Sequence, residues 1–368
     1  MTVLAIATTL VWAGLPLAHG GFWTMRERDT AALPDPARWP SVTAIVPARD
    51  EAEVIARSLG SLAAQDYPGR FRIVLVDDDS SDGTAAIART IGSDRIEVLC
   101  GAPLPAGWTG KLWAVAQGVA AAGSPDYLWL TDADIAHAPD TLRSLVARAV
   151  ANNCVLVSLM AKLRCESLAE RALIPAFVYF FAMVYPFARV NGRGRTAGAA
   201  GGCMLARRDA LERAGGIAAI RGALIDDCAF GAMMKREGRI WLGLTERSVS
   251  LRACPRFGDV AAMIARSAYA QLGYAPLALA GTIAALLLVF VAPPFLAMAD
   301  GAGAWVPYAL MTLSLLPILA FYRRSPLWAL LLPAIAAFYA GCTLLSAWQY
   351  SQGRGGMWKG RTQAAAAR

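Results

Sequence analysis

Short apolar runs alternate with amphipathic stretches between residues 41 and 160, and this alternation limits the possible fold more than any other feature of the chain. The runs have the length of strands and contain almost no polar residues, as expected for a parallel sheet covered on both faces. Segments long enough for helices separate them. The sequence therefore predicts an α/β domain with a Rossmann-like, mostly parallel sheet, a class of fold that binds nucleotides. The predicted strands are 42–46, 72–76, 96–99, 127–130 and 154–160.

The remainder of the chain is too apolar for an ordinary soluble protein. Hydrophobic residues make up 57% of the chain and charged residues 17%, with a mean hydropathy of +0.44. Residues 2–18 are almost wholly apolar, lack the basic start of a signal peptide, and are followed by Arg26 and Arg28. We therefore expect an uncleaved N-terminal transmembrane anchor, with the residues that follow it in the cytosol.

The C-terminal part contains three more apolar stretches, 276–298, 304–322 and 327–349, each long enough to span a bilayer. Three spans after one anchor would place the C-terminus outside, whereas the basic residues of the tail favour the cytosol. One stretch is therefore expected to be re-entrant or interfacial, and Pro293-Pro294 marks the expected place. An aromatic run at 171–187 is interpreted as a buried or interfacial helix, because a span there would separate residues that belong to one site.

Charge and cysteine usage exclude several classes of protein. The net charge of +8 comes almost entirely from arginine, which near apolar segments suits anionic lipid headgroups and phosphates. No basic stripe interleaved with aromatic residues is present, so we expect no nucleic-acid partner. The seven cysteines are scattered and lack C-x-x-C spacing, which predicts reduced thiols rather than a disulfide framework or a zinc site.

Two carboxylates, Asp132 and Asp134, directly follow the strand predicted at 127–130. Ligands of open α/β sheets gather at the carboxyl ends of strands. Paired carboxylates repel each other unless a cation lies between them, and Mg²⁺ is usually held by one or two carboxylates together with substrate phosphates. The pair alone is equally compatible with an ordinary turn or a helix N-cap.

Further polar groups follow the other predicted strands and should meet at the same edge of the sheet. A lysine at a helix start suits a phosphate, carboxylates can accept hydrogen bonds from a base or ribose, and an acid near a metal-bound phosphate ester can act as general base. The alternatives are a solvated lysine and first-turn acids of ordinary helices. His137 is expected to pack or cap. The groups are Pro47, Arg49 and Glu51; Asp77 and Asp78; Lys111; and Asp226 and Asp227.

The ordered set of motifs resembles the family-2 inverting glycosyltransferases of GT-A fold. The set comprises Pro-Ala-Arg-Asp-Glu (47–51), Val-Asp-Asp (76–78), Gly-Lys (110–111), Asp-x-Asp (132–134), Gly-Gly-Cys-Met (201–204) and Asp-Asp (226–227). Three longer strings resemble more closely the hopene-associated glycosyltransferase of hopanoid biosynthesis. They are Gly-Trp-Thr-Gly-Lys-Leu-Trp-Ala (107–114), Leu-Arg-Cys-Glu-Ser (163–167) and Arg-Gly-Ala-Leu-Ile-Asp-Asp-Cys (221–228).

The resemblance implies a role for each matching residue. The uracil pocket would be lined by Pro47, Arg49 and Glu51, and the uridine would be faced by Asp78 with Asp77 beside it. The nucleotide phosphates would be approached by Lys111 and, through Mg²⁺ or Mn²⁺, by Asp132 and Asp134. The acceptor hydroxyl would be deprotonated by Asp227, with Asp226 beside it.

The function implied is that of a membrane-bound, inverting transferase that moves a sugar from a UDP-sugar to a lipid acceptor, a hopanoid or another isoprenoid. It would be a multi-pass protein of the bacterial inner membrane with its catalytic domain in the cytosol. Processive relatives carry Gln-x-x-Arg-Trp, of which residues 263–271 keep only Arg266 and a displaced Tyr269, so a polysaccharide synthase is disfavoured. The alternatives are a polyprenyl-phosphate glycosyltransferase and a non-catalytic nucleotide-binding scaffold.

The same interpretation divides the chain into six parts. They are an N-terminal transmembrane anchor (1–20), a Pro-rich linker (21–40), a GT-A domain (41–258), an interfacial helix (259–275), C-terminal transmembrane segments (276–349) and a basic tail (350–368).

Overall fold

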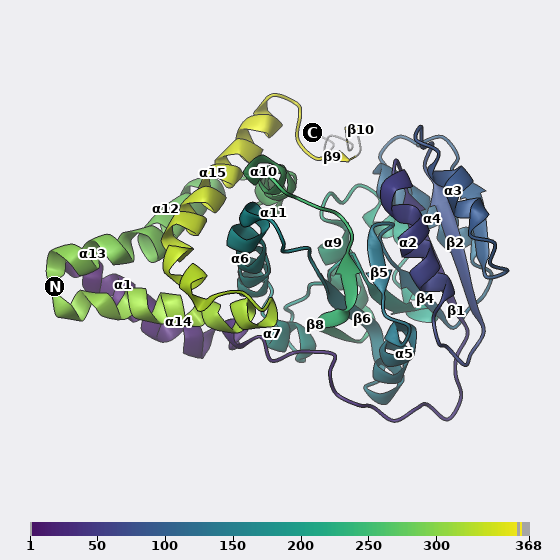
Figure 1. Ribbon diagram of the computed structural model, residues 1–368, viewed down its shortest axis with the longest axis horizontal. Coiled ribbons are helices and arrows are strands. Elements are labelled where there is room, and N and C mark those ends of the chain that lie inside the picture. The colour runs from purple at the N-terminus through teal and green to yellow at the C-terminus, as the bar shows by residue number, and fades with distance from the viewer. Residues whose placement is uncertain (1, 359–360, 363–368) are drawn as a thin grey trace. The chain divides into compact units, whose positions relative to one another are not determined.

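The computed structural model describes residues 2–358 and 361–362, and the chain forms two compact units (Figure 1). The sheet unit contains residues 27–163 and 189–252, together with the strand residues near the C-terminus. The helical unit contains residues 2–26, 164–188 and 253–356. Each unit has its own packing and is described by itself.

The sheet unit is built on one eight-stranded sheet with the order β3-β2-β1-β4-β7-β6-β8-β5. Parallel pairs join β1 to β2 and β4, β2 to β3, and β6 to β8. β7 runs antiparallel between β4 and β6, and β5 runs antiparallel to β8. The predicted α/β fold with a mostly parallel sheet is confirmed. The strands are β1 (Val42–Ala48), β2 (Phe71–Asp77), β3 (Ile96–Cys100), β4 (Tyr127–Leu130), β5 (Ile135–His137), β6 (Cys154–Lys162), β7 (Met204–Arg207) and β8 (Arg239–Ser250).

Helices cover both faces of this sheet, because alternate side chains of each strand point to opposite sides. Val46 and its β1 neighbours pack against α2 and α5 in the main hydrophobic core. On the opposite face Ile45 meets α4 at Gly118, where an added Cβ would lie only 2.5 Å from Ile45 Cγ2. The helices of this unit are α2 (Ala52–Ala63), α3 (Thr84–Thr90), α4 (Gly110–Ala121), α5 (Thr141–Ala151), α8 (Arg208–Arg213) and α9 (Asp226–Glu237).

The helical unit gathers apolar segments from three parts of the sequence. Its helices are α1 (Val3–Ala18), α6 (Leu168–Val184), α10 (Phe257–Ala265), α11 (Ala268–Gln271), α12 (Pro276–Leu286), α13 (Ala292–Asp300), α14 (Trp305–Phe321) and α15 (Leu332–Ser351), and the short α7 (Phe187–Asn191) links it to the sheet unit. Two continuous helices, Pro276–Ala299 and Pro326–Ser351, are long and apolar enough to cross a membrane; no other helix in the described part of the chain reaches that length.

The predicted N-terminal transmembrane span is not found. α1 has 16 residues, about 24 Å at 1.5 Å per residue, which is shorter than the hydrocarbon core of about 30 Å. One side of the helix packs within its unit: Trp12 is buried, donates from Nε1 to the carbonyl of Val289 at 2.8 Å, and meets Phe290 edge to face. Other apolar side chains of the helix, such as Leu10 and Leu17, are exposed.

The C-terminal stretches also differ from the prediction of three potential spans. The helix Trp305–Phe321 has 17 residues and is shorter than the two helices that could cross a membrane. Pro293-Pro294, by contrast, lies inside the continuous helix Pro276–Ala299, where a π-helical turn at Leu287–Val291 joins α12 to α13. The π-helical turn interrupts the regular i→i−4 hydrogen bonds just before the two prolines, which have no N–H to donate.

The aromatic segment predicted as a buried or interfacial helix forms α6. A capping box starts it: Ser167 Oγ accepts from Glu170 N at 3.1 Å, and Glu170 Oε2 accepts from Ser167 N at 2.9 Å. Buried hydrogen bonds then join α6 to the apolar helices, from Tyr179 Oη to Ser314 Oγ (2.7 Å) and from Tyr339 Oη to the carbonyl of Leu173 (3.0 Å). α6 is therefore an internal helix of this unit.

The predicted basic tail at 350–368 lies partly outside the described residues, which omit 359–360 and 363–368. Its described end forms two short antiparallel strands, β9 (Met357–Trp358) and β10 (Arg361–Thr362).

Candidate active site

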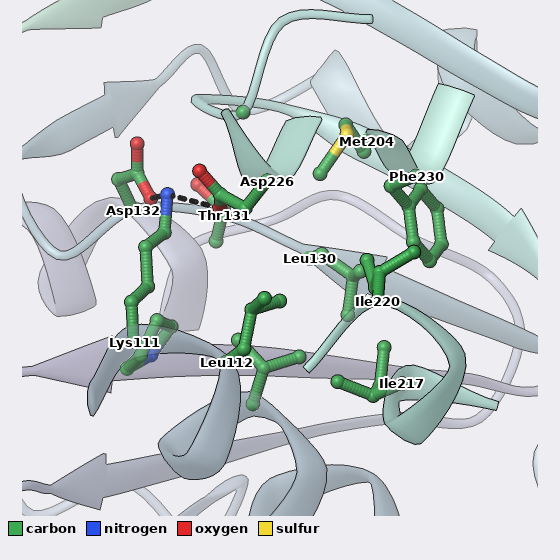
Figure 2. Close-up of a pocket in the computed structure, with 13 residues that line it drawn as sticks. Lys111, Leu112, Leu130, Thr131, Asp132, Met204, Ile217, Ile220, Asp226 and Phe230 are labelled. Carbon is green, nitrogen blue, oxygen red and sulfur yellow. Dashed lines mark ion pairs between the residues drawn. The ribbon is translucent and has the colours of Figure 1, made fainter. Parts of the chain in front are cut away.

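Lys111 lies between two carboxylates at the edge of the sheet where β1 and β4 end. Its Nζ is 2.8 Å from Asp132 Oδ1 and 3.0 Å from Asp226 Oδ2 (Figure 2). Burial lowers the pKa of Lys111, but the two carboxylates outweigh burial and raise it, so the ammonium group stays charged. Three residues that the sequence predicted to share one site therefore meet.

Local hydrogen bonds explain why these side chains converge. Thr109 caps α4, its Oγ1 accepting from Leu112 N, which places Lys111 in the first turn of the helix. Beyond β4, Thr131 N donates to the carbonyl of Ile45 (3.2 Å) and the Thr131 hydroxyl donates to the carbonyl of Gly202 (2.8 Å). These bonds fix the turn that carries Asp132.

A small cavity of about 20 Å³ opens beside this cluster, with room for no more than a water molecule. Its floor is apolar, formed by Leu112, Leu130 and Phe230 among others, and its polar rim includes Lys111 (Figure 2). Pro47, another predicted site residue, also lines it. A ligand as large as a nucleotide would have to lie along the polar rim rather than inside the cavity.

Asp227 is held by two backbone donors, Gly201 N at 3.0 Å and Cys228 N at 2.7 Å. Burial, followed by the negative charge of Asp226, raises the pKa of Asp227 to about 6, against the opposing effects of Lys111 and the two N–H groups. A carboxylate with this pKa is ionised at neutral pH and accepts a proton more readily than an ordinary aspartate. Asp226 and Asp227 also lie in the first turn of α9. The alternative interpretation, in which they are ordinary first-turn acids of a helix, is therefore compatible with the structure as well.

The Gly-Gly-Cys-Met loop passes close to this cluster at Gly201. A Cβ at that position would lie 3.4 Å from Lys111 Nζ and 3.4 Å from Asp227 Cβ, which is van der Waals contact. The loop backbone therefore lies directly beside both charged side chains.

Asp134 is bridged to Glu51 by Arg252, a residue that the sequence did not suggest. Arg252 Nε is 2.7 Å from Asp134 Oδ2, and its Nη2 is 2.6 Å from Glu51 Oε1. The bridge is anchored by Leu251 N, which donates to the Asp134 carbonyl at 2.8 Å just after β8 ends. Arg252 belongs to no recognisable motif, and in an arginine-rich chain nothing in the sequence distinguishes it.

The acidic pair fits a cation that arrives with a diphosphate. In the described part of the chain, no group of three or more His, Cys, Asp or Glu side chains could hold a metal. Asp132 and Asp134 supply two carboxylates, and Mg²⁺ commonly binds one or two carboxylates while substrate phosphates and water complete its shell. Lys111 and Arg252 now balance the charge of the two acids.

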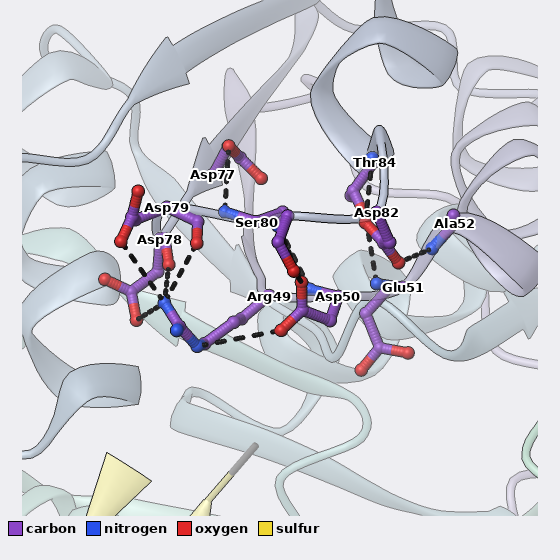
Figure 3. Close-up of polar contacts among 11 residues, drawn as sticks. Arg49, Asp50, Glu51, Ala52, Asp77, Asp78, Asp79, Ser80, Asp82 and Thr84 are labelled. Carbon is purple, nitrogen blue, oxygen red and sulfur yellow. Dashed lines mark hydrogen bonds and ion pairs between the residues drawn. The ribbon is translucent and has the colours of Figure 1, made fainter. Parts of the chain in front are cut away.

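A second polar cluster joins the loops after β1 and β2 (Figure 3). Arg49 Nη1 donates to the carbonyl of Asp78 and lies 3.9 Å from Asp78 Oδ2. Glu51 N donates to Thr84 Oγ1 at 2.8 Å, so the loop that carries Glu51 is tied to the start of α3. One oxygen of Asp77, Oδ1, is buried and has no hydrogen-bond partner among the described residues. Such an oxygen is suited to accept a hydrogen bond from a ligand.

His137 has a structural role, as predicted. It is buried, and its ring nitrogens lie 2.9 Å from Ser248 Oγ and 2.9 Å from Thr131 Oγ1. Burial lowers the pKa of His137 to about 3, so the ring is neutral. The histidine thus supports the turn before Asp132 and carries no charge there.

Residues 43–215 match the family model of glycosyl transferase family 2. The chain is 32% identical over 155 residues to an N-acetylglucosaminyltransferase of Rhizobium leguminosarum bv. viciae, covering 39% of this chain and 36% of that protein. It is 38% identical over 63 residues to glycosyltransferase AglE of Haloferax volcanii, covering 16% of this chain and 21% of that protein. The matches thus span about a third or less of these relatives.

Among solved structures, the fold is similar to that of the mannosyltransferase PcManGT from Pyrobaculum calidifontis in complex with GDP-Man and Mn²⁺. The TM-score is 0.55 at 22% sequence identity, over 94% of this chain and 98% of that chain. At 22% identity, this similarity shows a shared fold and not a shared activity. Together with the family match over residues 43–215, which is just under half of the chain, it makes this part of the chain similar to glycosyltransferase family 2 and to the GT-A fold.

Proposed function

We propose that the protein is a metal-dependent, inverting glycosyltransferase that moves a sugar from a UDP-sugar to a lipid acceptor. The observation that carries the proposal is the cluster around Lys111. Lys111 lies within hydrogen-bond reach of Asp132 and Asp226, and Asp227, whose pKa is raised, is the next residue of α9.

The proposal gives each group a part of the reaction. Asp132 and Asp134 would hold Mg²⁺ or Mn²⁺, which offsets negative charge on the leaving diphosphate. Lys111 would contact the same phosphates once the nucleotide sugar competes with Asp132 and Asp226 for its ammonium group. Asp227 would take the proton of the acceptor hydroxyl as that oxygen bonds to the anomeric carbon. The bond from that carbon to the UDP oxygen breaks on the opposite face, so the configuration inverts.

The nucleoside is proposed to lie along the second polar cluster. Arg49 and Glu51 would line the base with Pro47, and Asp78 would face the uridine. The unpartnered Asp77 Oδ1 supports a hydrogen bond in this region, because a buried carboxylate oxygen without a donor is costly. PcManGT was solved with GDP-Man and Mn²⁺, so GDP-mannose belongs beside UDP-sugars in any donor panel.

A lipid acceptor is supported by the two helices that could cross a membrane, Pro276–Ala299 and Pro326–Ser351. We infer an inner-membrane protein with its sheet unit in the cytosol, and a hopanoid or other isoprenoid alcohol as acceptor. The hopanoid assignment rests on the sequence strings at 107–114, 163–167 and 221–228.

The test is nucleotide release by the purified full-length chain. UDP-glucose, UDP-N-acetylglucosamine and GDP-mannose are supplied with Mn²⁺ and either a hopanoid alcohol or a polyprenyl phosphate, with EDTA as control. We expect metal-dependent release of UDP with the alcohol, and Asp227→Asn should lower it roughly 10²–10⁴-fold. A phosphate acceptor needs little deprotonation, so activity with polyprenyl phosphate that survives Asp227→Asn would favour that alternative. No turnover with any donor and lipid would leave only a nucleotide-binding scaffold.

A further inference from the structure

A second, larger cavity lies at the other end of α9. It has a volume of about 960 Å³ and is lined by loop residues 191–195 and by residues at the C-terminal end of α9 and the start of β8. The proposed base Asp227 is in the first turn of α9, whereas Arg236 is in the last, about 13 Å further along the helix axis. None of the residues assigned to donor or metal lines this cavity.

The cavity is strongly basic. Five of its lining side chains are cationic and none is acidic; they are Arg193, Arg195, Lys235, Arg236 and Arg239. Lys235 donates to the carbonyls of Val190 (2.6 Å) and Gly192 (2.5 Å), which fixes the loop against the helix. Burial, and then the positive charge of Arg239, lower the pKa of Lys235.

The four arginines of this cavity have no carboxylate partner within the described chain. Elsewhere in the sheet unit, Arg72, Arg143 and Arg213 each pair with an acid at 3.1 Å or less. All four are solvent-exposed and line one cavity, and a cluster of cations around a concave surface attracts anions to it. Guanidinium groups bind phosphate oxygens with paired, charge-assisted hydrogen bonds.

We propose that this basic cavity binds the phosphate of an anionic phospholipid headgroup. The choice of a lipid as the source of the phosphate rests on the membrane association included in the proposed function. It is also supported by the sequence, in which loop 192–195 follows the apolar helix α6 and the short helix α7. A membrane with anionic lipids offers phosphate at high local concentration to arginines near its surface. The site would hold the chain on such a membrane independently of the sugar-transfer reaction.

The test measures binding of dioctanoyl phosphatidylglycerol to the full-length chain in a neutral detergent, with dioctanoyl phosphatidylcholine and inorganic phosphate as separate ligands. The variant R193Q/R195Q/R239Q removes three of the five charges. The matched control R57Q/R70Q/R89Q makes the same change at exposed arginines of the sheet unit outside the cavity. We expect the first variant to weaken phosphatidylglycerol binding at least tenfold and the control to change it less than twofold.

Two results would overturn the proposal. Unchanged phosphatidylglycerol binding by R193Q/R195Q/R239Q would show that the cavity is not the site, and phosphate binding as tight as that of phosphatidylglycerol would show that the ligand is a soluble phosphate. If the triple variant fails to fold, R195Q and R239Q are tested singly, each with about a threefold loss expected. UDP binding measured on the same variants should be unchanged, so failure here is distinguishable from failure of the proposed transferase function.

Discussion

At the residue scale, the bridge from Arg252 to Asp134 makes a prediction about metal binding. Arg252 Nε lies 2.7 Å from Oδ2 of Asp134, one of the two proposed metal ligands, and would compete with a cation for that carboxylate. Removing its charge by Arg252→Gln should therefore tighten Mn²⁺ binding without nucleotide by about 3–10-fold, the effect of losing one partly exposed competing cation. Electron paramagnetic resonance of free Mn²⁺ measures this directly.

A matched control for this substitution is Arg256→Gln. Arg256 is exposed and pairs with Asp259, and both residues belong to the helical unit, away from the acidic pair in the sequence. Mn²⁺ affinity equal to wild type in Arg252→Gln would show that Arg252 does not compete for the proposed metal site.

The raised pKa of Asp227 predicts how activity depends on pH. The base works in its ionised form, so kcat/KM should fall as the pH drops through about 6, where Asp227 takes up its proton. Rates measured from pH 5 to 8 with saturating Mn²⁺ test this. The residual activity of Asp227→Asn should not show this fall of kcat/KM at low pH. If the variant showed the same fall, another group would be responsible for the titration.

At the element scale, two glycines in helices that cover the sheet predict opposite effects. A Cβ at Gly118 of α4 would lie 2.5 Å from Ile45 Cγ2, so Gly118→Ala should destabilise the protein by about 1–3 kcal/mol through overpacking. Gly60 in α2 has nothing within 4 Å of an added Cβ, so Gly60→Ala should stabilise it by about 0.5–1 kcal/mol. Thermal unfolding in one detergent compares the pair, and equal shifts would mean that α4 does not pack on β1 this closely.

The elements also show what the sequence could predict. Strands β1 to β4 and β6 were recognisable because each is a short apolar run followed by turn residues. The antiparallel place of β7 between β4 and β6 was not, since strand direction depends on pairing across the sheet. Hydropathy located α1 and α14 to within one residue at each end, but both helices are shorter than a typical membrane span.

The candidate site also has residues whose place could be predicted from the sequence and residues whose place could not. Lys111, Asp132 and Asp226 could be predicted to meet because motifs after successive strands share one edge of the sheet. Arg252 could not, because its role arises from the place where β8 brings it and not from neighbouring residues. The unpartnered oxygen of Asp77 is also a property of packing that no motif records.

At the scale of the whole molecule, the proposed topology can be tested through one cysteine. Cys100 at the end of β3 is exposed, whereas Cys154, Cys203 and Cys228 of the same unit are buried. If the sheet unit faces the cytosol, a membrane-impermeant maleimide should label Cys100 in inside-out vesicles of a bacterial host and leave it unlabelled in intact spheroplasts. The protein would be detected by mass shift after a short exposure.

Cys100→Ser is the matched variant, and it should abolish most of the labelling in inside-out vesicles because the other thiols of the sheet unit are shielded. Labelling of Cys100 in intact spheroplasts would place the sheet unit outside, away from the cytosolic pool of nucleotide sugars. That orientation would contradict the proposal that the enzyme takes its sugar from cytosolic nucleotide sugars, even if the purified enzyme were active.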